Sequence, residues 1–268
     1  MTTYEALQSA GYSRDGSIST DSKRVATFIG QSTDDWREIN RINGIDMYYV
    51  PATIRAFAPG RLNHYFKWEG PAYSVDTACT SSASAITLAC SALIARECDT
   101  AVAGGGNILN SPETYSGLSR GGFLSTTGAC KTFRHDADGY CRGEGVAVVI
   151  LKRLEDAFAE NDTIHAVIRG FAKNHSAWAE SITHPHPETQ QRLHAKLLRR
   201  SSVKPHEISY VEMHGTATQV GDVAEMTSVT NVLAQGRLSD NPLYLGAVKA
   251  NIGHGEAVGL AISWRIYH

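Results

Sequence analysis

The sequence lacks paired cysteines and long apolar runs. Its five cysteines are an odd number and include no CxxC pair, and no secretory signal precedes them. No window approaches the roughly 20 uninterrupted apolar residues that a membrane-spanning helix needs. We therefore expect a reduced, cytoplasmic protein that does not span a membrane.

Charge of one sign is also scarce. The formal net charge is −2, so the chain does not have the basic footprint of a nucleic-acid-binding protein. No run of like charges indicates an interaction tail. With 268 residues, 42% of them hydrophobic, the chain is long enough for one large α/β domain or two smaller ones. Partners must therefore be inferred from local sites.

Helical and strand-like patterns alternate along most of the chain, which favours a layered α/β architecture. The glycine-rich run at 103–107 lacks the spacing of a dinucleotide fingerprint, and we interpret it as a tight turn after a strand. The β-branched run at 145–154 predicts a buried strand, and residues 163–171 open a second half. Helices are predicted over 1–12, 80–97, 188–202 and 222–236, and strands over 24–30, 100–106, 145–154, 208–213 and 243–248.

The stretch VDTACTSS, residues 75–82, places Cys79 after a strand and in the first turn of a predicted helix. Unpaired backbone N–H groups and the helix dipole favour an anion there, so a thiolate forms more readily. The small residues around Cys79 leave room for a substrate. The alternative is a buried thiol at the start of a core helix, since free cysteine is among the most buried residue types.

Two histidines lie on loops that follow predicted strands. His214 opens HGTATQVGD after the strand at 208–213, and His254 lies in NIGHGE after the strand at 243–248. Open α/β sheets place their ligands at such strand ends. A lone histidine there is more often structural, but two at equivalent places favour a functional role.

Charged residues accompany these histidines. Asp222 and Glu225 lie one turn apart on a predicted helix, and Lys249 lies five residues before His254. An ion pair between Glu225 and Lys249 would hold the loop of His254 and adjust the electrostatic field at this histidine. The alternative is a solvated helix face and an ordinary surface lysine.

Two other patterns do not indicate a metal site. His184 and His186 lack cysteines or carboxylates at ligand spacing. The run DADGYCRGEG at 136–145 has the wrong acidic spacing for a calcium loop, and we interpret it as a turn before the strand at 145–154.

Four motifs in order, VDTACTSS, DADGYCRGEG, HGTAT and VKANIGHGE, resemble those of β-ketoacyl synthases, the condensing enzymes of fatty-acid and polyketide assembly. The stretches NHYFKWEGPAYSVDTAC, LSRGGFLSTTGACKTF, NHSAWAESITHPH and YVEMHGTATQ resemble more closely the ketosynthase of fungal iterative non-reducing polyketide synthases. The resemblance extends over nearly the whole chain.

The resemblance implies a thiolase-like α/β fold of two similar halves in a five-layered α-β-α-β-α arrangement, usually a homodimer. It implies that Cys79 is the acyl-accepting nucleophile and that His214 and His254 assist decarboxylation of the malonyl extender. Lys249 and Glu225 match the family's active-site lysine and its carboxylate partner. No metal or bound cofactor is implied, because phosphopantetheine arrives on an acyl carrier protein with the malonyl or acyl thioester.

The chain departs from the family pattern at Ala217, where glycine is usual, and at Thr80, where serine is usual. By comparison with the family, both ends look incomplete. We therefore predict a partial ketosynthase domain over 1–268, with most of the N-terminal half at 1–155 and part of the C-terminal half at 156–268. An inactive truncated remnant and an unrelated Cys-His thioester hydrolase are the alternative functions.

Overall fold

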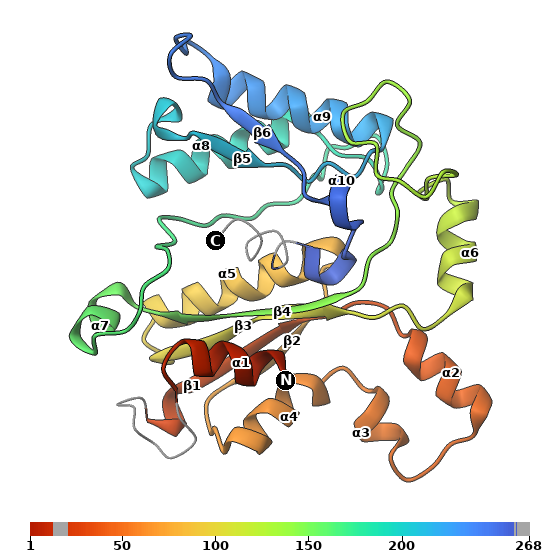
Figure 1. Cartoon of the computed structure of the whole chain (residues 1–268), viewed down its shortest axis with the longest axis vertical. Helices are drawn as coiled ribbons and strands as arrows, with labels where there is room; N and C mark the ends of the chain where they lie inside the picture. Colours follow the sequence, from red (N-terminus) through yellow and green to blue (C-terminus); the bar gives the residue numbers. More distant parts are fainter. Residues whose placement is uncertain (13–20, 260, 262–268) are drawn as a thin grey trace. The chain divides into compact units, whose positions relative to one another are not determined.

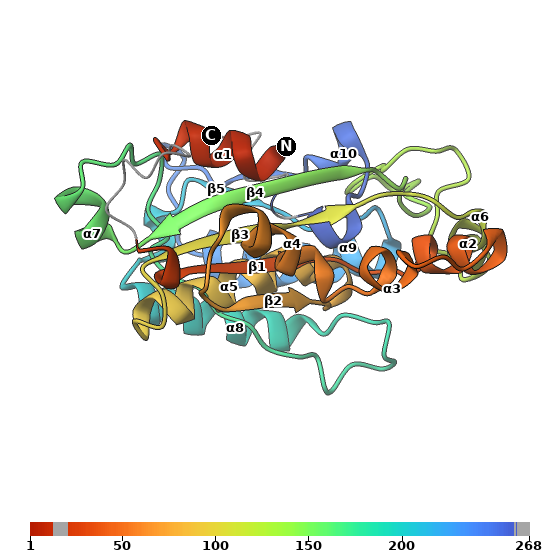
Figure 2. The same ribbon diagram turned by 90° about the horizontal axis from the view of Figure 1, so that it is seen from below.

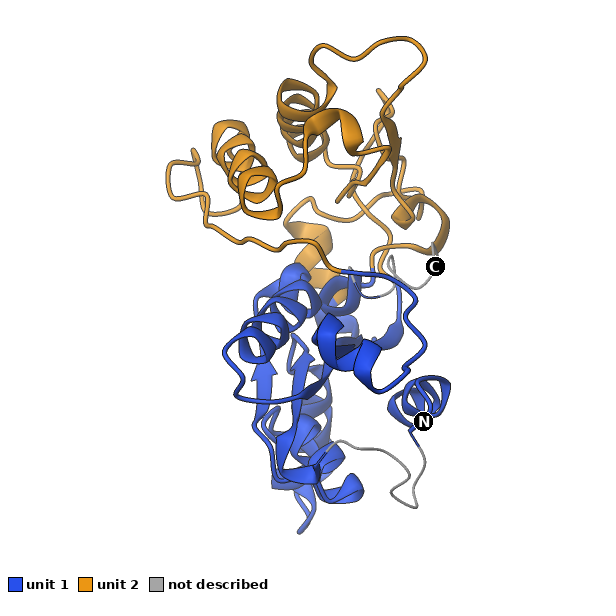
Figure 3. Cartoon of the chain, turned by 90° about the vertical axis from the view of Figure 1, so that its left-hand side faces the viewer, with its two compact units in different colours: residues 1–114, 143–167, 255–268 blue, residues 115–142, 168–254 orange. Residues whose placement is uncertain are grey.

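The computed structural model of the chain describes residues 1–12, 21–259 and 261. These residues form two compact units, each built from separate stretches of sequence (Figure 3). Unit 1 comprises residues 1–114, 143–167 and 255–268, and unit 2 comprises 115–142 and 168–254. The division into halves at residue 155 stays a prediction, since the units follow spatial contacts rather than chain order.

Unit 1 is built on a four-stranded sheet with the order β2-β1-β3-β4. Its first three strands are parallel and β4 is antiparallel to β3. The strands are β1 (Val25–Gly30), β2 (Ala72–Val75), β3 (Thr100–Asn107) and β4 (Gly145–Lys152). The predicted strands at 24–30, 100–106 and 145–154 are thus confirmed.

Helix α5 covers one face of this sheet, and α1 and α4 cover the other (Figures 1 and 2). The predicted helices at 1–12 and 80–97 are confirmed as α1 and α5. The helical elements of unit 1 are α1 (Thr2–Ser9), η1 (Ser22–Arg24), α2 (Asp35–Asn43), α3 (Tyr49–Thr53), α4 (Phe57–Phe66), η2 (Ala78–Thr80), α5 (Ser81–Ile94), α7 (Leu154–Ala159) and η5 (Glu256–Val258). Helix α6 (Pro112–Arg120) leads along the chain from unit 1 into unit 2.

The glycine-rich run at 103–107 lies inside strand β3, so its interpretation as a turn was wrong. Glycine is needed there because the neighbouring strands and α5 lie very close: a Cβ on Gly104 would stand 2.1 Å from the Ala147 carbonyl oxygen, and one on Gly105 2.7 Å from that of Gly30. A Cβ atom on Gly105 would stand 3.2 Å from the Ser82 Cβ, and one on Gly30 would stand 2.5 Å from the Ser81 backbone carbon. The missing side chains therefore allow the start of α5, just after Cys79, to rest on β1 and β3.

Strand β4 is less buried than its β-branched sequence predicted. Only Ala147 and Val148 are buried along it, and Val146 is 49% exposed. The reason is its place at one end of the strand order, where it pairs with β3 and α1 packs against it. The prediction of a strand was correct, but the prediction of full burial was wrong.

Unit 2 contains a pair of parallel strands, β5 and β6, against which α8 and α9 pack. Met213, Val229 and Leu233 form the centre of its core. His186, which the sequence did not favour as a metal ligand, caps α8 by accepting a hydrogen bond from the Thr189 amide. The elements are α8 (Pro187–Ser201), η3 (Pro205–Glu207), β5 (Tyr210–Glu212), α9 (Gln219–Val229), the π-helical turn η4 (Thr230–Ala234), β6 (Tyr244–Gly246) and α10 (Lys249–Ile252).

The predicted elements of unit 2 are confirmed with shorter strands than expected. Residues 163–171, expected to open the second half, form neither a helix nor a strand. The helical pattern at the end of the chain falls mostly on residues 260 and 262–268, which lie outside the described residues. Within the described part of the chain, every helix is too short or too polar to cross a membrane.

The close approach of α5 predicts a large difference between two strand glycines. Gly30→Ala places a methyl group against the Ser81–Ser82 backbone, which cannot move without shifting α5. We expect the free energy of unfolding to fall by about 1–3 kcal/mol, as for overpacked cores. A Cβ on Gly106 meets only the Val146 Cγ2, at an ordinary 3.6 Å. Gly106→Ala is therefore the control, and urea unfolding showing equal effects would contradict this account.

Candidate active site

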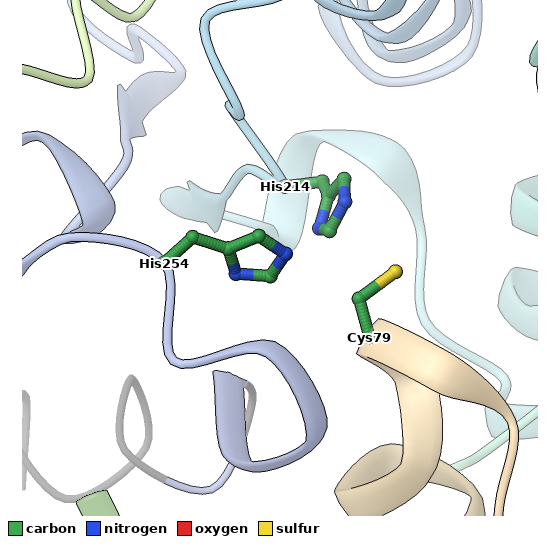
Figure 4. Close-up of side chains that lie close together, drawn as sticks. All are labelled: Cys79, His214 and His254. Atoms are coloured by element: carbon green, nitrogen blue, oxygen red, sulfur yellow. The ribbon is translucent and has the colours of Figure 1, made fainter. Parts of the chain in front are cut away.

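Cys79 lies in the short turn η2, between strand β2 and helix α5 of unit 1 (Figure 4). Helix α5 begins at Ser81. Cys79 therefore lies two residues before the helix, whereas we predicted it in the first turn. Cys79 is half-buried, so it is not the fully buried core thiol of the alternative interpretation. The turn presents the cysteine ahead of the helix rather than within it.

Hydroxyl side chains hold the turn around Cys79. The Ser81 Oγ accepts a hydrogen bond from the Thr77 amide at 3.0 Å and donates one to the Ala78 carbonyl at 2.6 Å. The Thr80 Oγ1 donates to the Thr77 carbonyl at 2.8 Å. Ala78 has a φ of 51°, a left-handed conformation that costs a non-glycine residue roughly 1–2 kcal/mol. Short hydroxyl residues suit this turn because they bond to nearby backbone groups.

Three other cysteines are poor candidates for a nucleophile. Cys90, Cys98 and Cys130 are buried. Burial raises the pKa of the Cys90 and Cys98 thiols to about 11, and it also raises the pKa of Cys130. A raised pKa leaves little thiolate at neutral pH.

His214 and His254 lie together in unit 2, as their equivalent sequence positions suggested. His214 follows β5, and His254 follows α10 (Figure 4). Their ring centres are 5.4 Å apart and the rings are nearly perpendicular, at 89°. Two imidazole groups at this separation can both reach one small anionic group.

The backbone at His214 is held by a carboxylate. Glu225, on α9, accepts hydrogen bonds from the His214 amide at 2.5 Å and from the Gly215 amide at 2.9 Å. The Thr132 hydroxyl donates to the Gly215 carbonyl at 2.8 Å. Glu225 therefore holds the loop of His214, whereas we predicted that it would hold the loop of His254.

His254 is held by residues of the motif DADGYCRGEG, which we predicted to form a turn and to belong to the family pattern. The His254 amide donates to the Cys141 carbonyl at 2.7 Å, and Arg142 forms an isolated β-bridge with His254. The Tyr140 ring packs edge-on against the His254 ring, with centres 5.0 Å apart. In the sequence, only the resemblance of this motif to the family pattern indicated that the segment contributes to the site.

The electrostatic environment keeps both histidines neutral at physiological pH. Burial, followed by the charge of Lys249, lowers the pKa of His214 to about 4. Burial, followed by His214 and Lys249, lowers the pKa of His254 to about 2. His254 is only 3% exposed. His214 is exposed. The pKa of His254 is lowered further than that of His214 because the charge of His214 also acts on it.

Lys249 is 5% exposed, so the surface-lysine alternative is wrong. Burial raises the pKa of Glu225, while the amides of Gly215 and His214 and the charge of Lys249 act in the opposite direction. The charge of Lys249 therefore acts on both histidines and on Glu225.

Asp222 has a structural role that the sequence did not reveal. Its two carboxylate oxygens accept hydrogen bonds from the Phe133 amide at 2.8 Å and the Ala217 amide at 3.1 Å. Ala217 has a φ of 57°, a conformation that explains why glycine suits this position in the family. Asp222 thus fixes the strained end of the loop that His214 opens.

Comparison with known proteins identifies the class. Residues 1–157 match the β-ketoacyl synthase N-terminal domain family, and residues 165–263 match the C-terminal domain family. The chain belongs to the β-ketoacyl synthase family, and the thiolase-like fold class is confirmed.

Individual relatives narrow the resemblance to polyketide synthases. The chain is 63% identical to a non-reducing polyketide synthase from Aspergillus ustus over 98% of its own length. It is also 63% identical to one from Pseudevernia furfuracea over 96% of its length. It spans 13% and 12% of these two relatives. The predicted resemblance to fungal non-reducing polyketide synthases is therefore confirmed.

Solved ketosynthases have the same fold. The ketosynthase from module 6 of the bacillaene synthase of Bacillus subtilis superposes with a TM-score of 0.89 at 32% identity, covering 98% of this chain and 45% of that one. An oxazolomycin ketosynthase domain from Streptomyces albus gives 0.88 at 33% identity, covering 99% and 46%.

The lowered pKa of His254 predicts acid-sensitive stability. In the unfolded chain His254 takes up a proton near its ordinary pKa of 6.5, but in the folded chain only near 2. Below about pH 6.5 the unfolded state therefore binds more protons, and stability falls by up to roughly 1.4 kcal/mol per pH unit from this residue. Urea unfolding between pH 7 and 5 should show a shallower pH slope for His254→Gln than for the exposed-site control His165→Gln. Equal slopes would show that His254 titrates normally in the folded chain.

Proposed function

We propose that this chain carries the ketosynthase reaction of polyketide biosynthesis, with Cys79, His214 and His254 as its catalytic residues. The observation that carries the proposal is the neutral histidine pair, 5.4 Å apart, in the field of a buried lysine. A neutral imidazole has one N–H to donate at neutral pH without first gaining a proton. Paired donors suit the stabilisation of an enolate.

The first step is acyl transfer to Cys79. Its thiolate attacks the carbonyl carbon of an acyl thioester on the carrier's phosphopantetheine, forming a new C–S bond. The carrier's C–S bond then breaks, and the pantetheine thiol leaves with a proton. The turn at Ala78–Thr80 supports this role, because it holds a half-buried cysteine at the end of a parallel strand.

The second step is decarboxylative condensation. The malonyl thioester loses carbon dioxide, and its electron pair becomes an enolate whose oxygen accepts hydrogen bonds from His214 and His254. The enolate carbon attacks the acyl carbonyl on Cys79, and the C–S bond breaks to restore the thiolate. The product is a β-ketoacyl chain on the carrier, longer by two carbons. Lys249 and Glu225 support this step by setting the field and the loop geometry.

The partners in this proposal are an acyl carrier protein, which brings phosphopantetheine, and a second copy of the chain. Strand β2 supports homodimer formation because it stands at the end of the strand order and three of its four residues are exposed. An exposed strand edge is a template for pairing with another strand.

Acylation of Cys79 is the first test. Incubation with an acyl-pantetheine thioester should add one acyl group to the intact chain by mass spectrometry. Cys79→Ala should lose the adduct, whereas Cys90→Ala should keep it, because the Cys90 thiol has a pKa of about 11. A soluble wild-type chain without an adduct, or an adduct that survives Cys79→Ala, would refute the assignment. Rapid release of free acid instead would indicate a hydrolase.

Decarboxylation tests the histidines separately from the cysteine. We expect His214→Ala and His254→Ala each to slow carbon dioxide release from a malonyl-pantetheine thioester by about 10²–10³-fold, as for loss of one donor to a developing oxyanion. The acylation of Cys79 should fall less. His165→Ala, at an exposed site, is the control. Decarboxylation that is insensitive to both substitutions would exclude the proposed role.

A further inference from the structure

Asp76 connects the turn that carries Cys79 to a distant charged side chain. It is the first residue after strand β2, and its Oδ1 accepts a hydrogen bond from the Ala78 amide at 3.0 Å. Its Oδ2 forms an ion pair with the Arg55 guanidinium. Both carboxylate oxygens are therefore engaged, one by the backbone next to the nucleophile and the other by a cation.

Arg55 belongs to the connection between α3 and α4, outside the Cys79 turn. Its Nε lies 3.2 Å from the Asp34 Oδ1. Its carbonyl accepts a hydrogen bond of 3.4 Å from the Gln31 side chain, and the Gln31 amide donates to the Val75 carbonyl at 3.0 Å. We call the set Asp34, Arg55 and Asp76 the arginine brace.

The arginine brace joins the loops that leave two neighbouring strands. Gly30 at the end of β1 lies opposite Val75 at the end of β2, so both loops start at the same edge of the sheet. Asp34 is in the first loop and Asp76 is in the second, which continues to Cys79. The Arg55 guanidinium is hydrogen-bonded to Asp76 and lies within ion-pair distance of Asp34. A planar guanidinium fixes the direction of a carboxylate better than a flexible ammonium does.

Stability alone does not account for this arrangement. The side chains of Arg55, Asp34 and Asp76 are 29%, 45% and 37% exposed, and ion pairs at such exposure contribute little. The turn, however, includes an energetically unfavourable backbone conformation, since Ala78 has a φ of 51°. A carboxylate fixed by Arg55 keeps the Ala78 amide bound and so keeps this conformation in place.

We propose that Arg55 is a positioning residue for Cys79: by holding the Asp76 carboxylate, it keeps the turn in the geometry from which the thiolate reacts. The brace rests on contacts within unit 1, and the role of Cys79 as the nucleophile rests on the proposed function.

The chain contains a matched control for the turn. Asp46 accepts a hydrogen bond of 2.9 Å from the amide of Tyr48, two residues further on, as Asp76 does from Ala78. Asp46→Asn therefore changes the same kind of turn at another place in unit 1. It separates the local effect of an Asp-to-Asn change from the effect on the nucleophile.

The test compares Arg55→Met, Asp76→Asn, their double variant, Arg55→Lys and Asp46→Asn in the whole chain. Two rates are measured by intact-protein mass spectrometry: alkylation of Cys79 by iodoacetamide, and its acylation by an acyl-pantetheine thioester. We expect Arg55→Met and Asp76→Asn each to slow both rates about 3- to 10-fold. The double variant should be no slower than the slower single variant, because both remove one interaction. Arg55→Lys should recover part of the rate, and Asp46→Asn should leave it unchanged.

Three results would overturn the proposal. The first is an unchanged rate in Arg55→Met. The second is a double variant slowed by the product of the two single effects. The third is a slowing in Arg55→Met and Asp76→Asn that Asp46→Asn also shows at an equal loss of thermal stability. Alkylation also separates this proposal from the proposed function. If Cys79 is alkylated faster in the wild-type chain than in Arg55→Met and Asp76→Asn, but is never acylated, the role of the brace is supported and the ketosynthase activity is refuted.

Discussion

The burial of His254 is the constraint on which the histidine site depends. An imidazole that is 3% exposed loses most of the hydration that would stabilise its cation, and the nearby Lys249 disfavours the cation further. The backbone amide of His254 bonds to the Cys141 carbonyl, and the Tyr140 ring packs edge-on against the imidazole. The fold thus keeps His254 neutral well below the pH at which an ordinary histidine takes up a proton, and a neutral donor suits a reaction that creates negative charge on oxygen.

Backbone strain and its compensation recur in both units. Ala78 and Ala217 each adopt a left-handed conformation next to a residue assigned to the chemistry or to its loop. In each case a carboxylate two to five residues away accepts a hydrogen bond from the backbone, Asp76 from Ala78 and Asp222 from Ala217. Strain of this kind persists only where surrounding contacts determine it, and it gathers at functional sites. The two turns therefore share one physical solution.

The sheet of unit 1 supports the nucleophile through absent side chains. Gly30 and Gly105 allow the first turn of α5 to approach the strand backbones. This close packing fixes the position of the turn that carries Cys79, directly before α5. In the sequence, the run at 103–107 that contains Gly105 suggested a turn. Composition cannot distinguish the two cases, because glycine serves both a reversed chain and a close packing contact.

The sequence by itself determined the elements, the family and the identities of Cys79, His214, His254, Lys249 and Glu225 as candidates, since periodicity and ordered motifs are local properties of the chain. Only the tertiary structure decided which groups meet. Glu225 bonds to the loop of His214, Cys141 holds His254, and Arg55 reaches Asp76 across 21 positions of sequence. The lowered pKa values of the histidines belong to this second group. Desolvation and charge depend on distances between segments remote in sequence, and no local pattern encodes them.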